Sequence, residues 1–157
     1  MEGDLTLGVG AALRNHTFCR GLSEPQLESL AALAGEASFR ENEVILEEGQ
    51  RSAAFYLLLS GSVTVELRTP QYAISVQALE PGSVFGWSAL LNDQDTLFRV
   101  RAREATTALR INGAALQSSC RKDPALGFEI LYRVLKVVAG RVRSTEMRFA
   151  EMCGVRL

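Results

Sequence analysis

The chain has little of what most catalytic and metal centres need. Its 157 residues include one histidine, His16, and three widely spaced cysteines, Cys19, Cys120 and Cys153. That supply excludes a disulfide framework and leaves too few ligands for a zinc site or a histidine-based catalytic group. We expect His16 to be a surface or interface residue and the cysteines to be small reduced core or surface residues.

Other signatures of enzymes and of charged partners are also missing. The sequence has no nucleophile–base arrangement, metal cluster or Walker-type loop, so it predicts no enzyme, no catalytic residue and no metal site. Lys plus Arg number 17 against 18 Asp plus Glu, which excludes an overall positive field for nucleic acid. No run approaches the length of a membrane span, and the N-terminus does not resemble a signal peptide. We therefore expect a cytoplasmic protein that binds neither nucleic acid nor membrane.

The length and composition suit a single domain with a real core. Hydrophobic residues make up 47% of the chain. Residues 1–12 are small, contain glycine and show no clear period, so we expect a loose N-terminal lead. A helical pattern follows from Leu13 to Ala34, with Ser23 as an N-cap, Pro25 in the first turn and Gly35 at its end.

Short apolar segments separated by turn residues follow this helix. They are expected as strands at 37–39, 44–46, 54–59, 63–67, 72–76 and 106–111. Gly61 and Thr69-Pro70-Gln71 are the predicted corners between the middle segments, and Gly61 is explained best by turn geometry. Many short strands at near-regular spacing indicate a closed or sandwiched β unit.

The most informative stretch is Pro81–Leu91, with the sequence PGSVFGWSALL. Turn residues, an apolar pair and a second glycine are followed by small and helix-forming residues, which predicts a strand that stops at Gly86 and a short helical turn. The N-terminal end of a helix leaves backbone N–H groups unpaired and favours negative charge. This order therefore predicts an anion-binding turn.

Taken together, four segments carry a family resemblance: Glu48-Gly49, Tyr56–Val63, Pro81-Gly82 and Phe85–Leu91. They resemble the cyclic nucleotide-binding domain, the effector module of catabolite-activator-type regulators, over roughly residues 18–152. The resemblance implies an α+β fold: a β-roll (double-stranded jelly roll) over residues 13–125, with flanking helices, a short phosphate-cassette helix and a long C-terminal helix at 126–157. It also implies a cyclic nucleotide such as cAMP or cGMP as effector.

The chain departs from the family pattern at two ligand positions. The family pattern has a glutamate for the ribose and an arginine for the cyclic phosphate, where this chain has Trp87 and Thr96. Trp87 has two interpretations: a large apolar cap on the short helix, or a ring that stacks on a planar ligand or closes the pocket. Arg99, Arg101 and Arg103 share a strand face, and either one of them is a substitute for the missing arginine or all three belong to a solvated face.

The candidate ligand-binding residues that follow from the resemblance are Phe85, Gly86, Trp87, Ser88, Ala89, Leu90, Thr96, Leu97, Arg99 and Thr145. Thr145 belongs to the C-terminal helix, which in the family lays a polar side chain over the nucleotide base. It equally fits a polar position at the end of a helix–helix contact.

The C-terminal helix is predicted from Asp123 as N-cap and Pro124 at the first helical position. Eight of its residues are spaced alternately three and four apart: Phe128, Leu131, Leu135, Val138, Val142, Thr145, Phe149 and Met152. This set, named here the seam, is a heptad pattern that predicts a helix–helix interface, and the family forms its dimer there. Ile130, Val134 and Val137 lie on a neighbouring face that can dock on the β unit.

The sequence predicts a cyclic nucleotide-binding-like sensor or regulatory domain that forms a homodimer through residues 126–152. Its effector is either a weakly bound cyclic nucleotide or a different small molecule, and an unidentified downstream protein responds to it. With only a few residues after 152, we expect no helix-turn-helix domain for DNA. The alternative is a ligand-free dimerising scaffold with a degenerate pocket.

Overall fold

The computed structural model describes the backbone of residues 2–93 and 95–156, and side chains from residue 8 onward. The helical elements are α1 (Glu2–Asn15), η1 (Thr17–Cys19), α2 (Glu24–Ala31), η2 (Trp87–Leu90), α3 (Gly113–Lys122) and α4 (Pro124–Met152). The strands are β1 (Ala34–Phe39), β2 (Val44–Leu46), β3 (Ala54–Ser60), β4 (Val63–Arg68), β5 (Ala73–Leu79), β6 (Val84–Phe85), β7 (Arg99–Ala102) and β8 (Thr106–Asn112). This is the predicted α+β architecture of a β-roll with flanking helices.

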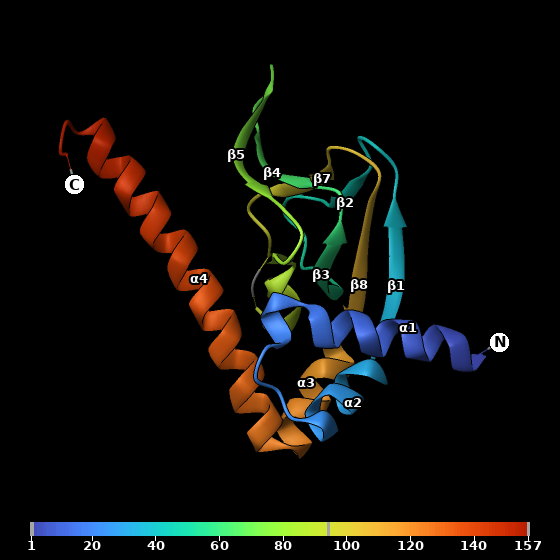
Figure 1. Cartoon of the computed structure of the whole chain (residues 1–157). Helices are drawn as coiled ribbons and strands as arrows, with labels where there is room; N and C mark the ends of the chain where they lie inside the picture. The colour runs from blue at the N-terminus through green and yellow to red at the C-terminus, as the bar shows by residue number, and fades with distance from the viewer. Residues whose placement is uncertain (1, 94, 157) are drawn as a thin grey trace.

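The strands form two four-stranded antiparallel sheets, one in the order β1-β8-β3-β6 and the other in the order β2-β7-β4-β5. The helices gather at one end of the roll, and α4 runs along its flank and extends beyond it (Figure 1). Of the helices in the described ranges, none combines the length and apolar character needed to cross a membrane.

Alternation along the strands divides the core into two clusters. Inside the roll, Tyr56, Leu58, Val63, Phe85 and Val100 pack together. On the outer face of the first sheet, strand residues that include Phe55, Leu57 and Leu109 pack against the helices. Ile130 of α4 is buried in this outer cluster, and Val134 and Val137 pack against it, which confirms the predicted docking face. Successive residues of a strand point to opposite faces, so one sheet serves both clusters.

Two expectations about the N-terminal region are wrong. Residues 2–15 form α1 rather than a loose lead, because Val9 and Leu13, one helical turn apart, are buried against the outer cluster. This tertiary packing stabilises the helix, although the local sequence pattern gives only a weak helical signal. Gly35 lies in β1, paired with Arg110, instead of ending the preceding helix, which stops at Ala31.

The predicted helix caps are confirmed. The Ser23 hydroxyl accepts a hydrogen bond from the Gln26 N–H, and the Gln26 side chain completes a capping box. The Asp123 carboxylate accepts from the Leu126 N–H at the start of α4. Gly61 lies in the left-handed region at φ 80°, and a Cβ there would approach the backbone oxygen of Ala105 to 2.5 Å, so turn geometry does require glycine.

His16 is buried within the chain, contrary to the expectation of a surface or interface position. Its Nδ1 accepts a hydrogen bond from the Phe18 N–H, so the neutral ring carries its proton on Nε2 and donates to the Leu58 carbonyl, each over 3.1 Å. Burial lowers the pKa of His16, although the bond to Leu58 opposes this effect. A neutral histidine therefore links the segment after α1 to β3.

This histidine makes stability depend on pH near neutrality. The pKa of His16 is lower in the folded than in the unfolded chain, so the unfolded chain takes up the proton first as pH falls. The contribution of neutral His16 to stability is therefore complete above about pH 6.5, and it is lost as pH falls through the folded pKa. We expect the free energy of unfolding, from urea titrations, to fall between pH 7 and pH 5. In His16→Asn this dependence should be much weaker, and an equal slope in both chains would contradict the assignment.

Candidate functional site

The cassette, residues 85–91, has the predicted shape: β6 ends at Phe85 and the 3-10 helix η2 begins at Trp87. Gly86 between them has φ 80°, and a Cβ at this position would lie 2.6 Å from the Ala54 carbonyl oxygen. Residues other than glycine rarely adopt this left-handed backbone conformation, and their Cβ would also clash with the neighbouring strand β3. Gly86 is therefore what turns the chain from strand to helix.

The rest of the cassette is held by buried packing and hydrogen bonds. The Phe85 ring stacks on Tyr56 with centroids 4.8 Å apart. The Ser88 hydroxyl accepts from the Ser52 N–H over 3.1 Å. The Gln117 amide of α3 donates to the Ala89 carbonyl over 3.0 Å, and Leu90 packs against the outer cluster. These contacts fix the turn in place.

Thr96 closes a loop at the position where the family resemblance places an arginine. Its hydroxyl lies 2.8 Å from the carbonyl oxygens of both Glu47 and Gln50, and its N–H donates to Gln50. The Gly49 N–H donates in turn to the Thr96 carbonyl. Thr96 thus joins the chain after the cassette to the β2–β3 loop, and its hydroxyl proton is already used.

Arg99 does not stand in for that arginine. It alternates with Val100, which points into the roll, so Arg99 lies on the outer face of the second sheet. There Arg99 and Arg101 donate to the two oxygens of the buried Glu66 carboxylate over 2.8 and 2.6 Å. Burial alone would raise the pKa of Glu66, but hydrogen bonds from the two arginines and from Thr64 outweigh it and lower that pKa. Leu97 is 71% exposed and lies outside the cavity described next.

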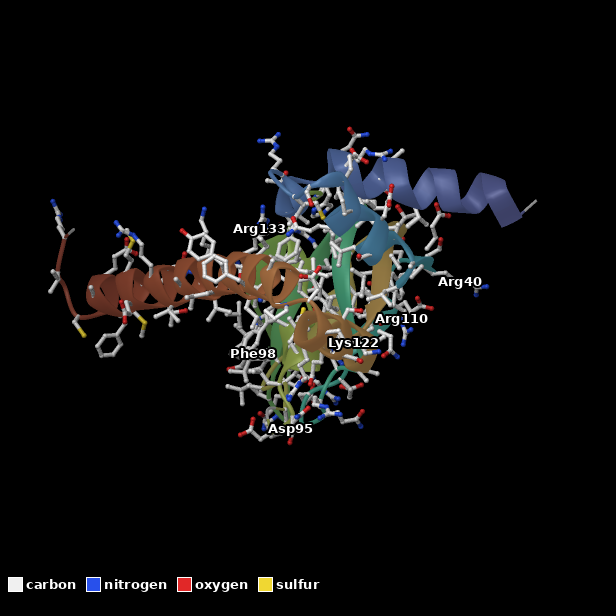
Figure 2. The ribbon with its side chains drawn as sticks, turned by 90° about the horizontal axis from the view of Figure 1, so that it is seen from below. Arg40, Asp95, Phe98, Arg110, Lys122 and Arg133 are labelled. Carbon is white, nitrogen blue, oxygen red and sulfur yellow. The ribbon has the colours of Figure 1, made fainter. Side chains whose placement is uncertain are left out.

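A cavity of about 400 Å³, named here the slot, lies between the roll and α4. Trp87 and Phe98 contribute aromatic walls, Val65 and Val76 come from β4 and β5, and α4 covers the slot with residues that include Val138, Val142 and Thr145. Figure 2 shows Phe98 on the side of the roll next to α4, with Asp95 at an edge farther from that helix. Apolar walls with a few polar groups are typical of ligand pockets.

Of the ten candidate ligand-binding residues, Trp87 and Thr145 line this slot. Trp87 also packs against the outer cluster, so its two interpretations are compatible. The Thr145 hydroxyl donates to the Arg141 carbonyl one turn earlier, over 2.9 Å. Sequence reasoning missed three lining residues: Val65 and Val76, which were expected only as strand residues, and Phe98, to which no role was assigned.

Arg141 is a second residue that sequence reasoning missed. Its Nη2 donates to the Val84 carbonyl over 2.7 Å, and burial lowers the pKa of its guanidinium. It lines the slot from α4, one residue before the seam position Val142. A charged residue beside a heptad pattern usually indicates a solvated face, so the sequence carried no signal for its burial.

The seam is largely unburied in the single chain. Six of its members are about half exposed or more: Phe128, Leu131, Leu135, Val142, Phe149 and Met152. Val138 and Val142 belong to both the seam and the wall of the slot. A contiguous apolar stripe of this kind on a monomer indicates an interaction surface.

Two facing sheets, a glycine-bounded cassette and a long C-terminal helix over an apolar slot define the class of β-roll effector-binding domains. The family model of the cyclic nucleotide-binding domain matches residues 36–123, more than half of the chain, and the chain belongs to that family. This confirms the resemblance drawn from the sequence.

The similar proteins include protein kinases and bacterial proteins. The chain is 29% identical over 94 residues to a cGMP-dependent protein kinase of Eimeria tenella, an alignment that covers 60% of the chain and 9% of the kinase. The chain thus spans about a tenth of the length of the curated relatives it matches. A structure from Geobacter metallireducens GS-15, described as a cyclic nucleotide-binding protein, has a TM-score of 0.76 and 28% identity, covering 85% of this chain and 97% of the other.

Two more distant structures share the fold. A cyclic nucleotide-binding domain from Methylobacillus flagellatus KT has a TM-score of 0.78 at 17% identity, and the alignment covers 95% of this chain and 84% of the Methylobacillus chain. A regulatory subunit of a cAMP-independent protein kinase A from Trypanosoma brucei, crystallised as a triple mutant with cAMP, has a TM-score of 0.74 at 20% identity, over 93% and 52% of the chains.

Proposed function

We propose that this domain is a sensor in which a small effector binds in the slot and shifts α4 against the β-roll, and that a partner protein responds to the shift. The observation that supports this is the double use of α4: Val138 and Val142 wall the slot and also belong to the exposed seam. A ligand between the roll and α4 contacts these side chains directly. Its binding free energy can therefore favour one position of the helix.

The effector is a cyclic nucleotide, cAMP or cGMP, bound weakly, or another planar molecule of similar size. The slot, at about 400 Å³, falls in the range of small-molecule sites. Trp87 and Phe98 offer ring faces for stacking. The kinase relatives are named for cGMP, and the Geobacter protein is described as binding cyclic nucleotides.

Weak binding follows from the state of the cassette. Thr96 is uncharged and its hydroxyl is hydrogen-bonded to the β2–β3 loop, while the guanidinium of Arg99 is paired with Glu66, so neither side chain provides a free cation for a phosphate. A charge-assisted bond to an ionic group contributes about 1.5–3 kcal/mol, so its loss weakens binding by about one to two powers of ten. The Trypanosoma variant that was crystallised with cAMP includes a threonine-to-arginine replacement.

We further propose that two copies associate through the seam. The exposed members extend over most of α4, from Phe128 to Met152, in an unbroken heptad spacing that matches side chains of a second helix. In such a homodimer the movement of one helix reaches the other through shared contacts. The seam is then the route by which effector binding in one copy affects its partner.

A second candidate function is a ligand-free scaffold that serves only to dimerise. It is favoured by the packing of Trp87 against the outer cluster and by the Thr96 contacts, which stabilise the cassette without a ligand. Under this alternative the domain dimerises equally well with and without any nucleotide.

Restoring the two family residues tests the sensor proposal. We expect the double variant Trp87→Glu, Thr96→Arg to bind cAMP or cGMP about 10- to 100-fold more tightly than the unchanged chain in calorimetry. Trp87→Glu with Leu97→Arg is the matched control, because it adds the same arginine one residue away at an exposed position. No detectable heat from either the unchanged or the restored chain at millimolar nucleotide would contradict cyclic nucleotide binding and favour the scaffold.

A further inference from the structure

A second concavity lies beside the slot, between the middle of α4, η1 and the β5–β6 loop. It has a volume of about 740 Å³. Four cationic side chains line it: Arg20, Arg133, Lys136 and Arg141. We name it the basic groove. In Figure 2, Arg133 lies where α4 passes the N-terminal segment, and its guanidinium donates to the Arg20 carbonyl over 2.5 Å.

The positive charge of this groove is only partly neutralised. One carboxylate, Glu129, lines it, and Glu129 is ion-paired with Arg133 on the same helix. In the described part of the chain, no carboxylate lies within salt-bridge distance of Arg20, Lys136 or Arg141. The protein as a whole is near neutral, so this accumulation is local rather than a consequence of composition. A groove with one sign of charge concentrates ligands of the opposite sign.

Arg141 is partly buried, unlike the exposed Arg20 and Lys136, and among the described residues it has no carboxylate within salt-bridge distance. A guanidinium has five N–H donors, and one of its nitrogens is bonded to the Val84 carbonyl. Burial lowers the pKa of Arg141, and no carboxylate opposes that effect. A buried charge is costly unless it is paired, and an anion in the groove would supply the missing partner.

Gly140 leaves the surface of α4 free of a side chain beside Arg141. It lies within a 29-residue helix, where glycine costs about 1 kcal/mol relative to alanine. A Cβ at Gly140 would meet nothing within 4 Å, so no neighbouring atom requires glycine. Gly140 lines the groove beside Arg141, where the absence of a side chain leaves the helix open to a ligand.

The groove also contains an aromatic side chain, Tyr132, whose ring is stacked with Phe128 at a centroid distance of 5.8 Å. The Tyr132 side chain lines it, is about half exposed, and lies beneath the Lys136 ammonium, which is 5.6 Å from the ring centroid. The hydroxyl groups of Thr17 and Ser144 add polar contacts at the rim. An anion bound by Lys136 would thus have an aromatic ring next to it.

We propose that the basic groove is a second ligand site, which adjoins the slot and shares Gln77, Arg141 and Ser144 with it, and that it binds a small phosphorylated organic molecule. The phosphate pairs with Arg141 and Lys136, and the organic part lies against Tyr132. Such a ligand would connect α4 to η1 and to the β5–β6 loop, and so hold the helix that also covers the slot. This proposal does not depend on any ligand binding at the cassette.

Amide chemical shifts of the full chain test the proposal, with pyrophosphate and adenosine 5'-monophosphate as probes. We expect saturable shifts at Thr17, Gly82 and Gly140 with both probes, and tighter binding of the nucleotide because it adds the contact with Tyr132. Lys136→Glu should weaken binding of both probes at least about tenfold, the effect of losing one charge-assisted contact and adding a like charge.

Lys122→Glu is the matched control, because it makes the same change of charge on α3 outside the groove. It should leave both affinities within about twofold, since exposed charges beyond a Debye length are screened at physiological salt. Absence of saturable shifts at the three groove amides at millimolar probe, or equal weakening by the two variants, would overturn the proposal. Shifts at Trp87 and Ser88 with cyclic nucleotide report on the slot, so failure of either site is recognised separately.

Discussion

Leu135→Arg is expected to dissociate the proposed homodimer into monomers. Leu135 lies near the middle of the seam and is 62% exposed in the single chain. In a two-fold symmetric helix pair the change is made twice, removing two buried leucines, each contributing about 1.5–3 kcal/mol, and placing two like charges in the interface. We expect the dimer dissociation constant to rise by at least about a hundredfold. Sedimentation equilibrium over a range of protein concentrations measures it.

The control for this prediction is Leu97→Arg, the same chemical change at a position that is 71% exposed and outside the seam. It should leave the dissociation constant unchanged. Circular dichroism of both variants checks that the fold is retained, which we expect because Leu135 makes little contact within its own chain. A wild-type chain that sediments as a monomer at every concentration would refute the homodimer.

Glu66→Gln is expected to give the largest loss of stability among single conservative changes on the outer sheet face. The Glu66 side chain is 4% exposed and accepts from both Arg99 and Arg101. Removing its charge leaves two arginines paired with a neutral amide, and breaking a buried ion pair typically costs about 3–5 kcal/mol. Because Arg101 is 36% exposed and can reach water, we expect a loss of about 2–4 kcal/mol in urea unfolding.

The pH dependence of this effect has a definite sign. The folded pKa of Glu66 lies below its ordinary value of 4.5, so its contribution to stability is complete above that value and is lost as pH falls through the folded pKa. The difference between Glu66→Gln and the unchanged chain should therefore shrink in acid. Glu24→Gln is the control, because Glu24 pairs with Arg14 at the exposed surface. We expect this variant to lose much less free energy of unfolding than Glu66→Gln. Equal losses in the two variants would contradict the structural role of Glu66.

The contrast between Arg99 and Arg141 shows where sequence reasoning about the site ended. Arg99 stands close to the cassette in the chain, yet strand alternation directs it to the outer face and to Glu66. Arg141 is 57 residues after Val84 in the chain, yet α4 brings it to the Val84 carbonyl. Distance along the chain is therefore a poor guide to which arginine lies near the cassette, because alternation on a short strand directs one side chain to the outer face while the long helix passes back beside Val84.

Local patterns determined most of the fold by themselves. Ser23 and Asp123 marked helix starts, Gly86 marked the turn from strand to helix, and heptad spacing defined the seam, because caps, left-handed glycines and helical periodicity act within a few residues. The burial of His16, the helix at residues 2–15 and the basic groove were decided only by the tertiary structure. Each depends on contacts between segments far apart in the chain, and the free energy of those contacts has no local signature in the sequence.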